Sequence, residues 1–493
     1  MVFNSYTFIA FFILILILHN LPFPWKVKKV NLLLASYIFY AAWNPPFIIL
    51  LWISTLIDYI AGLKLHAEEN PTKRKWWLAA SLVGNLGMLG YFKYGGFLLE
   101  NFVAFTSALG IDFHPAEPNI ILPVGISFYT FQTLSYTLDM YRKTSPPEKS
   151  LLDFSLFVTF LPQLVAGPIV RPNELIPQFK QPHVATREQM MKGLFFLSLG
   201  LFMKSVLADT LLASSADSVF GAPMPVMALD AWLGVLAFSG QIFFDFAGYS
   251  TCAIGIGYCF GFTLTENFKY PYAAIGFSDF WRRWHITLST WLRDYLYIPL
   301  GGNRKGEVRT YINLMITMLL GGLWHGASWT FVVWGALHGS YLCIEKLIRE
   351  KFVSTPKPPE QALDAPIIVR ASVMPLAKSN SLNNFLLALF TFFLVNVTWV
   401  FFRAGDFPTA WRLLSSMFGQ TTNGTAILAT IDIIKVVIVV FCMVVAHWFM
   451  RNTSVMEVAK KMKWWAVSIV WAFMIIALII SQKSSDSFIY FQF

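Results

Sequence analysis

Charged residues are scarce in this chain of 493 residues, of which Asp, Glu, Lys and Arg make up only 13%. Soluble proteins contain about 25% charged residues, whereas this chain is 56% hydrophobic and has a mean hydropathy of +0.57. The shortage of charge excludes a water-soluble globular protein. Length alone would allow about three domains, but apolar runs recur along nearly the whole chain. We therefore expect one membrane-embedded domain over residues 1–493.

Cysteine is also rare, and its spacing excludes a cysteine-based metal or redox site. No two of the four residues form a CxxC pair, and we expect buried free thiols in apolar stretches at Cys252, Cys259, Cys343 and Cys442. The net charge of +10 is carried by short basic clusters between apolar runs. Membrane topology explains this placement better than nucleic-acid binding does.

Several motifs of nucleotide binding and catalysis are missing from the sequence. It contains no GxxxxGK(S/T) phosphate loop, no HExxH zinc helix and no GxSxG nucleophile elbow. Neither His285 nor His325 is followed five residues later by Asp, which excludes the HxxxxD pattern of acyltransferases that act at a membrane face. We expect no metal site and no bound cofactor.

The apolar runs and the basic clusters between them predict the topology. Residues 8–21 have no basic region before them and no small-residue cleavage site after them, so we expect a retained helix rather than a signal peptide. The lysines within residues 26–29 follow, and the positive-inside rule places them in the cytoplasm and the N-terminus outside. A later crossing, residues 76–92, should lead to an external segment over about residues 93–119. The whole pattern predicts an all-α polytopic protein with about ten full crossings and both termini outside.

Two apolar stretches do not fit a simple crossing. Residues 151–170 are interrupted by a Pro-Gln and a Gly-Pro pair, which predicts a re-entrant element buried in protein or lining a cavity. Residues 311–323 number only 13 and, at about 1.5 Å each, are too short to cross a core of about 30 Å. With residues 329–344 they predict a hairpin whose tip, at His325, stops partway through the membrane.

Two polar segments are expected in the cytoplasm. Residues 263–310 contain seven basic and four acidic residues, and the proline-rich residues 351–381 indicate a linker. The aromatic and basic stretch around His285 predicts a helix at the cytoplasmic entrance, either an interfacial anchor or a collar that binds a phosphate-bearing acyl donor. The residues of this donor collar are Arg282, Arg283, Trp284, Arg293 and Arg304.

Among the eight histidines, His325 and His285 are the candidates for chemistry. Ionisable groups within a membrane are costly and typically face functional cavities, and a neutral imidazole suits a general base. A structural role for either histidine stays open. Solvated or snorkelling side chains are expected at His19, His66, His114, His183 and His447.

A polar passage should reach His325. Its expected lining consists of Asp245, Trp324, Ser328 and His338. For Asp245 the alternative is a paired structural charge, and for His338 a buried structural hydrogen bond. Asp58, also within an expected crossing, is more typical of a structural charge.

Two stretches of the sequence resemble the membrane-bound O-acyltransferase (MBOAT) family, specifically its alginate O-acetylation branch. They are residues 281–304, WRRWHITLSTWLRDYLYIPLGGNR, and residues 319–329, LLGGLWHGASW. Residues 122–142, residues 160–171 and the C-terminal FIYFQF support the resemblance, which covers most of the chain.

The resemblance implies a helical bundle around a central tunnel in the cell inner membrane. An acyl group would move from a cytoplasmic thioester, acetyl-coenzyme A or a phosphopantetheine carrier, to a polysaccharide hydroxyl outside, through a partner of the SGNH acetyltransferase type. The family's essential histidine falls on His325 and its second site histidine on His285. The geometry this implies makes His325 the base, with His285 as our candidate for stabilising the oxyanion. Relatives often have GYSD where residues 248–251 are GYST, so no role is carried onto Thr251.

Other functions stay open. The related teichoic acid D-alanylation branch shares the RWH and WHG motifs, but residues 297–304, YIPLGGNR, favour polysaccharide acetylation. A transporter would also contain broken segments near the membrane midplane, although the sequence shows no inverted symmetry. A scaffold of a polysaccharide export complex would need no histidine at the hairpin tip.

Overall fold

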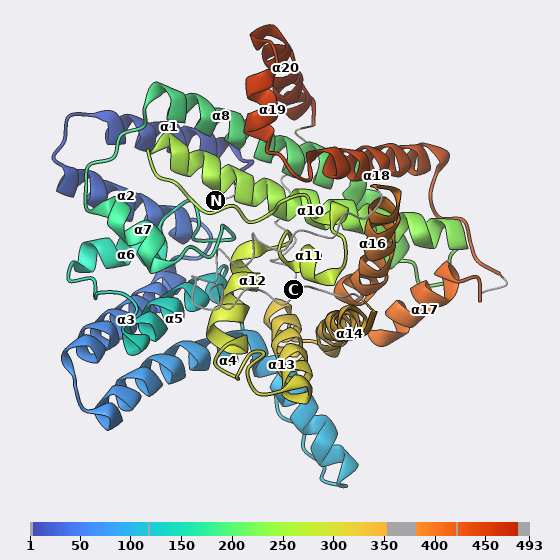
Figure 1. The fold of residues 1–493 in the computed structure, drawn as a ribbon, viewed down its shortest axis with the longest axis horizontal. Coiled ribbons are helices and arrows are strands. Elements are labelled where there is room, and N and C mark those ends of the chain that lie inside the picture. The colour runs from blue at the N-terminus through green and yellow to red at the C-terminus, as the bar shows by residue number, and fades with distance from the viewer. Residues whose placement is uncertain (1–2, 117–118, 353–380, 421–422, 482–493) are drawn as a thin grey trace.

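The computed structural model describes residues 3–116, 119–352, 381–420 and 423–481, and the regular secondary structure of these residues is almost entirely helical (Figure 1). An isolated parallel bridge joins Val226 and Thr425. The predicted all-α class is therefore confirmed. The cytoplasmic linker expected at residues 351–381 and the C-terminal FIYFQF lie almost wholly outside the described residues.

The helices follow one another with short connections. The first part of the chain forms α1 (Tyr6–Asn20), α2 (Trp25–Ala41), the 3-10 turn η1 (Pro45–Phe47), α3 (Ile48–Ala67), α4 (Pro71–Ala108), α5 (Ile126–Arg142), α6 (Leu151–Thr159) and α7 (Pro172–Phe179). The middle part forms α8 (Arg187–Leu201), the π-helix η2 (Phe202–Ala213), α9 (Ser214–Phe220), α10 (Ala228–Cys259), the 3-10 turn η3 (Pro271–Ala273), α11 (Phe277–Trp281), α12 (Ile286–Leu292), the π-helix η4 (Arg293–Tyr297), α13 (Glu307–His325) and α14 (Trp329–Phe352). The last part forms α16 (Ser381–Arg403), α17 (Phe407–Met417), α18 (Thr430–Met450), α19 (Val455–Lys461) and α20 (Trp464–Ile480).

Helix α10 is the central element, and α8, η2, α16 and α18 pack against it (Figure 1). Within the described residues, five helical stretches are long and apolar enough to cross a membrane: Pro45–Ala67, Arg187–Phe220, Ala228–Cys259, Leu382–Arg403 and Thr430–Met450. Helices α1 and α20 are apolar but have only 15 and 17 residues. The count of ten crossings stays a prediction.

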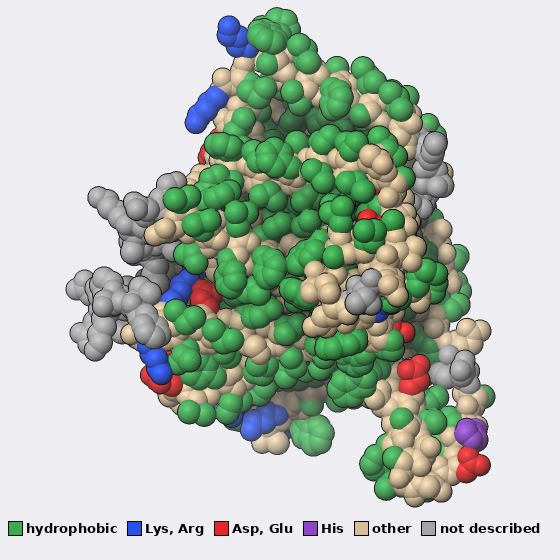
Figure 2. Space-filling model, turned by 90° about the vertical axis from the view of Figure 1, so that its right-hand side faces the viewer, with side chains coloured by type: hydrophobic (Ala, Val, Ile, Leu, Met, Phe, Trp, Pro, Cys, Tyr) green, Lys and Arg blue, Asp and Glu red, His purple; other side chains and the backbone are tan. Residues whose placement is uncertain are grey.

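The surface agrees with a lipid environment. Figure 2 shows one side of the molecule as a broad hydrophobic face, with most charged side chains toward its edges. Cys442 of α18 is exposed, unlike the buried Cys252 and Cys259. The prediction that all four thiols are buried was therefore wrong, because an apolar helix in lipid can expose a thiol as readily as a leucine.

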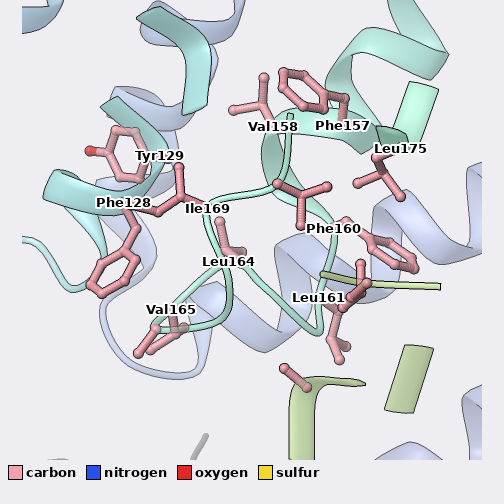
Figure 3. Close-up of a cluster of buried hydrophobic side chains, with 14 of the residues drawn as sticks. Phe128, Tyr129, Phe157, Val158, Phe160, Leu161, Leu164, Val165, Ile169 and Leu175 are labelled. Carbon is pink, nitrogen blue, oxygen red and sulfur yellow. The ribbon is translucent and has the colours of Figure 1, made fainter. Parts of the chain in front are cut away.

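The second half of residues 151–170 is irregular, buried backbone, as its Pro and Gly residues predicted, whereas the first half is helix α6. A re-entrant path through the membrane stays a prediction. Helix α6 ends at Thr159, and the following residues turn through the core with Leu161, Leu164, Val165 and Ile169 packed among other apolar side chains (Figure 3). Side-chain hydroxyl groups accept hydrogen bonds from some of the backbone amides that are not paired within a helix. The amide of Leu161 donates to Ser36 Oγ (3.0 Å), and that of Ile169 donates to Thr287 Oγ1 (3.1 Å). Protein rather than lipid surrounds this segment, as irregular backbone at membrane depth requires.

The expected hairpin forms, but its first arm is longer than predicted. Helix α13 has 19 residues because Glu307 and the residues after it join the helix, and at about 1.5 Å per residue it is about 28 Å long. This length is still slightly below a core of about 30 Å, and α13 is not among the described helices that are long and apolar enough to cross, so an arm that stops partway through the membrane stays a prediction. The bend itself is confirmed, since the helix ends at His325 and Gly326 is extended (φ −161°, ψ 154°). At Gly322 a Cβ atom would lie 3.0 Å from Gly335 Cα, so small residues let the two arms pack closely.

Helix α4 continues well beyond the expected crossing. It has 38 residues, about 57 Å at about 1.5 Å per residue, and its C-terminal part projects from the bundle (Figure 1). The residues from Lys93 onward, expected as an external segment, thus begin as helix. Asn70 caps the start of α4 by accepting hydrogen bonds from the amides of Thr72 (2.9 Å) and Lys73 (3.3 Å).

Candidate functional site

His325 is the last residue of α13 and is buried, with 3% of its surface exposed. Aromatic rings surround its imidazole: the ring centroids of Trp324, Trp334 and Phe402 lie 5.1, 5.0 and 5.2 Å away. These rings come from α13, α14 and α16, so three helices define its position. The side chain faces the protein interior rather than lipid.

His285 lies at the break between α11 and α12. The continuous helix predicted here was wrong, because α11 ends at Trp281 and His285, with φ +43°, is the left-handed residue that precedes α12. Asn267 stabilises the break: its carbonyl accepts from the amide of Ile286 (2.9 Å) and its side-chain oxygen from the amide of Thr287 (3.2 Å). A strained non-glycine conformation held by its surroundings is typical of functional positions.

The break brings His285 beside His325, with ring centroids 6.4 Å apart. Trp324 contacts both, its ring 5.8 Å from that of His285. Within the described part of the chain, neither ring nitrogen of His285 has a hydrogen-bond partner, and the indole N–H groups of Trp324 and Trp334 also lack one. Buried polar atoms are costly unless they are hydrogen-bonded. The site therefore offers donors and acceptors to polar substrate atoms.

Of the expected passage residues, His338 borders this site, and Ser328 lies three residues after His325 in the sequence. His338, fully buried on α14, lies 3.1 Å from Thr398 Oγ1 through its Nε2 atom, and its ring is 4.6 Å from that of Trp334. Ser328 precedes α14 and caps it, accepting a hydrogen bond from the amide of Thr330 (3.3 Å). Their passage-lining role stays a prediction.

Asp245 is held in an ion pair. Its carboxylate lies 2.5 Å from Lys204 Nζ, which also contacts Asp209 Oδ1 at 2.8 Å. Lys204 lies on η2, and the sequence analysis missed it because a single lysine in an apolar run gives no pattern. The pairing supports the structural interpretation of Asp245.

The expected donor collar does not form one surface. Trp284 is fully buried, and so offers no surface to a donor in this conformation. Arg283 is bound within the protein: it pairs with Asp279 (2.9 Å) and donates to the carbonyl of Arg451 (3.0 Å). Burial would raise the pKa of Asp279, but Arg283 and Arg451 outweigh it and hold that pKa below its usual range.

The other collar residues lie at or near the surface. Arg282 and Arg304 are exposed, while Arg293 is half-buried and pairs with its neighbour Asp294 (2.8 Å). The middle of residues 263–310 is largely buried, so this stretch is more than a cytoplasmic loop. Its aromatic residues direct it into the core despite its net positive charge.

A basic groove lies at one end of this segment. It has a volume of about 420 Å³ and is lined by Arg142, Ile298, Pro299, Gly301, Arg304 and Lys305. Three cations around one groove suit a phosphate-bearing ligand. Of these three cations only Arg304 was predicted in the donor collar, because Arg142 is distant in the sequence.

The remaining histidines differ in exposure, and His183 is half-buried. His66 and His114 are exposed, as expected. The prediction of solvated side chains was wrong for two others, which are buried and hydrogen-bonded: His19 Nε2 lies 3.0 Å from the carbonyl of His183, and His447 Nδ1 accepts from the amide of Tyr272 (3.2 Å). Hydropathy cannot distinguish a histidine at a helix end in water from one packed under a neighbouring loop.

Comparison with known proteins identifies the family. The model of the MBOAT, membrane-bound O-acyltransferase, family matches residues 146–370. A probable alginate O-acetylase AlgI of Azotobacter vinelandii is 42% identical over 420 residues, covering 85% of this chain and 78% of that protein. A peptidoglycan O-acetyltransferase of Helicobacter pylori is 38% identical over 449 residues, with 85% and 78% covered. A teichoic acid D-alanyltransferase of Lacticaseibacillus rhamnosus is 27% identical over 347 residues, with 60% and 84% covered.

The first two similarities extend over most of both chains, far beyond the RWH and WHG motifs, and they agree with the helical, largely apolar structure. This multi-pass membrane protein therefore belongs to the membrane-bound O-acyltransferase family.

Proposed function

We propose that the protein transfers an acetyl group from a cytoplasmic thioester to hydroxyl groups of an extracytoplasmic polysaccharide, and that His325 and His285 carry the chemistry. The observation that supports this most is the convergence of the two imidazoles, with centroids 6.4 Å apart, from separate segments of the chain. A purely structural buried histidine would be expected to have at least one ring nitrogen hydrogen-bonded, as His19 and His447 do, whereas neither ring nitrogen of His285 has a partner within the described residues.

The reaction we propose is a direct acyl transfer. The imidazole of His325 accepts the proton of the acceptor hydroxyl, and the oxygen attacks the thioester carbonyl carbon. An N–H of His285 donates to the resulting oxyanion. The carbon–sulfur bond then breaks, and the leaving sulfur takes the proton from His325. The products are an ester and a free thiol.

Burial of the pair supports this chemistry. Both imidazoles are shielded from bulk water by aromatic rings, which protects a reactive thioester from hydrolysis and strengthens the hydrogen bond to the oxyanion. The indole N–H groups of Trp324 and Trp334 would orient the acyl group and the acceptor. His338, Ser328 and Asp245 would line the polar passage to His325 or stabilise the helices that form it.

The donor would bind at the basic groove. Acetyl-coenzyme A and phosphopantetheine carriers both contain phosphate, which Arg142, Arg304 and Lys305 can neutralise. In this proposal residues 263–310 lie on the cytoplasmic side, the protein crosses the inner membrane about ten times, and both termini lie outside. The polysaccharide would be reached through an extracytoplasmic SGNH-type acetyltransferase.

Two alternatives have specific tests. D-alanyl transfer from a carrier protein to teichoic acid is less favoured, because the similarity to the D-alanyltransferase is 27% against 42% for the alginate O-acetylase. A transporter would move a polysaccharide or lipid without forming an ester.

The test is acyl transfer by the full chain in proteoliposomes. Labelled acetyl-coenzyme A or D-alanyl carrier would be supplied on the donor side. An SGNH-type acetyltransferase with alginate oligosaccharides or peptidoglycan fragments would be supplied on the other side, and labelled ester would be measured. We expect acetyl ester with the wild type and a loss of at least about 100-fold with His325→Gln. His66→Gln, which changes an exposed histidine, is the matched control. Wild-type turnover by His325→Gln would overturn the assignment, and passage of unmodified substrate without ester would identify a transporter.

A further inference from the structure

A lysine on α4 contacts the end of the helix that carries His325. Lys93 Nζ donates to the carbonyl of Trp324 at 2.7 Å and to that of His325 at 2.9 Å. Its third neighbour is Ser127 Oγ on α5, at 3.5 Å. One ammonium group therefore joins α4, α5 and α13 at the site.

The neighbouring residue extends the same contact. The hydroxyl of Tyr94 donates to the carbonyl of Leu323 at 2.7 Å. Three consecutive carbonyls at the end of α13 are thus bound by two consecutive residues of α4. The last four carbonyls of any helix lack partners within the helix, and they carry the negative end of its dipole, which a cation stabilises.

The backbone of α13 needs such an external partner at this end. Helices commonly end in a left-handed residue whose amide closes the last turn, but Gly326 is extended here. Gly321 and Gly322 precede the site residues and Gly326 follows them, and glycine leaves the backbone free to adopt many conformations. A glycine-flanked helix end does not by itself fix the direction of the His325 side chain.

We propose that Lys93 is a positioning residue for His325: its ammonium group fixes the carbonyls of Trp324 and His325, and thereby aims the imidazole at the reacting hydroxyl. The ammonium group does not touch substrate in this role, because its hydrogen bonds go to backbone and to Ser127. This inference rests on the proposed function of His325. Acyl transfer is sensitive to such positioning, since a displacement of about 1 Å can cost about 100-fold in rate.

The test measures kcat and KM of the reconstituted full chain with acetyl-coenzyme A. Lys93→Met should lower kcat about 10- to 100-fold and leave the KM for the donor within about two-fold, because the donor groove is not altered. Lys93→Arg should recover much of the loss, since a guanidinium group can donate to both carbonyls. Lys192→Met is the matched control: Lys192 is another half-buried lysine, whose Nζ donates to Tyr258 Oη at 2.8 Å, and its replacement should leave kcat near wild type.

A double variant separates positioning from general stability. If Lys93 acts through His325, then Lys93→Met should change the residual rate of His325→Gln little, because effects of residues that act as a unit do not add. A loss that multiplies in the His325→Gln background, a wild-type kcat for Lys93→Met, or no recovery with Lys93→Arg would overturn the proposal.

A second substitution of Lys93 and the single variant His325→Gln allow the test to be interpreted if Lys93→Met fails to fold or if the proposed function is wrong. If Lys93→Met is not monodisperse, Lys93→Gln replaces it, and an intermediate kcat is expected because one amide group can donate to either carbonyl. His325→Gln alone distinguishes the two failures: wild-type turnover by that variant refutes the proposed function itself, whereas its inactivity together with a fully active Lys93→Met refutes only the role of Lys93.

Discussion

Two buried polar clusters in this protein are built in opposite ways. Asp58, on α3, accepts hydrogen bonds from Ser81 and Asn85 of α4 and Thr137 of α5. Asn85 in turn accepts from Ser54 at 2.7 Å. The carboxylate of Asp58 is thus surrounded by donors of the chain itself. A buried charge with such a set of partners holds helices together.

The pair of His285 and His325 is surrounded by rings instead. Phe246, Phe128 and Trp324 contact His285, and within the described residues its two nitrogens have no hydrogen-bond partner. Both clusters are buried and both draw on distant segments. The difference is that the chain completes the hydrogen bonds of Asp58 but, within the described residues, not those of His285. This difference distinguishes a structural group from one that can bind polar substrate atoms.

The ion pair of Lys204 and Asp245 gives the largest expected effect on stability. Lys204→Met should lower the free energy of unfolding by about 3 to 5 kcal/mol, because it leaves a buried carboxylate without its cation. Lys204→Met with Asp245→Leu should recover much of the loss. Chemical unfolding in detergent micelles measures both. If Asp245→Asn instead lowers turnover per folded molecule at unchanged stability, Asp245 is part of the functional site of His285 and His325 rather than a structural charge.

Replacement of His285 should act on rate rather than on stability. His285→Ala should lower kcat about 100- to 1,000-fold, the usual effect of removing an oxyanion donor. Its free energy of unfolding should change little, because the side chain makes no hydrogen bond within the described residues. His285→Asn tests whether any loss of stability comes from the backbone conformation at this position, since asparagine adopts positive φ readily. A large loss of stability in both variants would place His285 with the structural cluster.

The Asp58 cluster should show the reverse behaviour. Asp58→Ala removes three hydrogen bonds and leaves buried donors unsatisfied, so the free energy of unfolding should fall by about 1 to 3 kcal/mol. Turnover per folded molecule should stay near wild type. Comparing unfolding with specific activity in the same preparation checks both expectations, and a kcat loss as large as that of His285→Ala would contradict the comparison.

The sequence predicts well what depends on hydropathy and on backbone chemistry. The scarcity of charge indicates the helical membrane class, and the Pro and Gly residues within residues 151–170 predict the irregular buried segment. The bend after His325 follows from the glycine beside it. Each of these features is local, so a single stretch of sequence contains the cause.

What the sequence leaves undetermined depends on contacts between distant segments. The φ of +43° at His285 is held by Asn267 from another turn of the chain, and the partner of Asp245 is a lone lysine on η2. The length of α13 was underestimated because charged residues can extend a helix without extending its apolar run. Lys93 looked like the start of a loop, yet it lies on a continuous helix against the site.

The smallest expected effect concerns the donor groove, where charges are exposed rather than buried. Arg304→Glu and Lys305→Glu should each raise the KM for acetyl-coenzyme A about two- to five-fold, because exposed charge pairs contribute about 0.2 to 1 kcal/mol. The effect should shrink as salt rises, since screening acts over about 8 Å at physiological ionic strength. Lys73→Glu, an exposed lysine at the start of α4, controls for general surface charge. If Arg282→Glu raises the KM more than both groove variants do, the donor binds at the predicted collar and not in the groove.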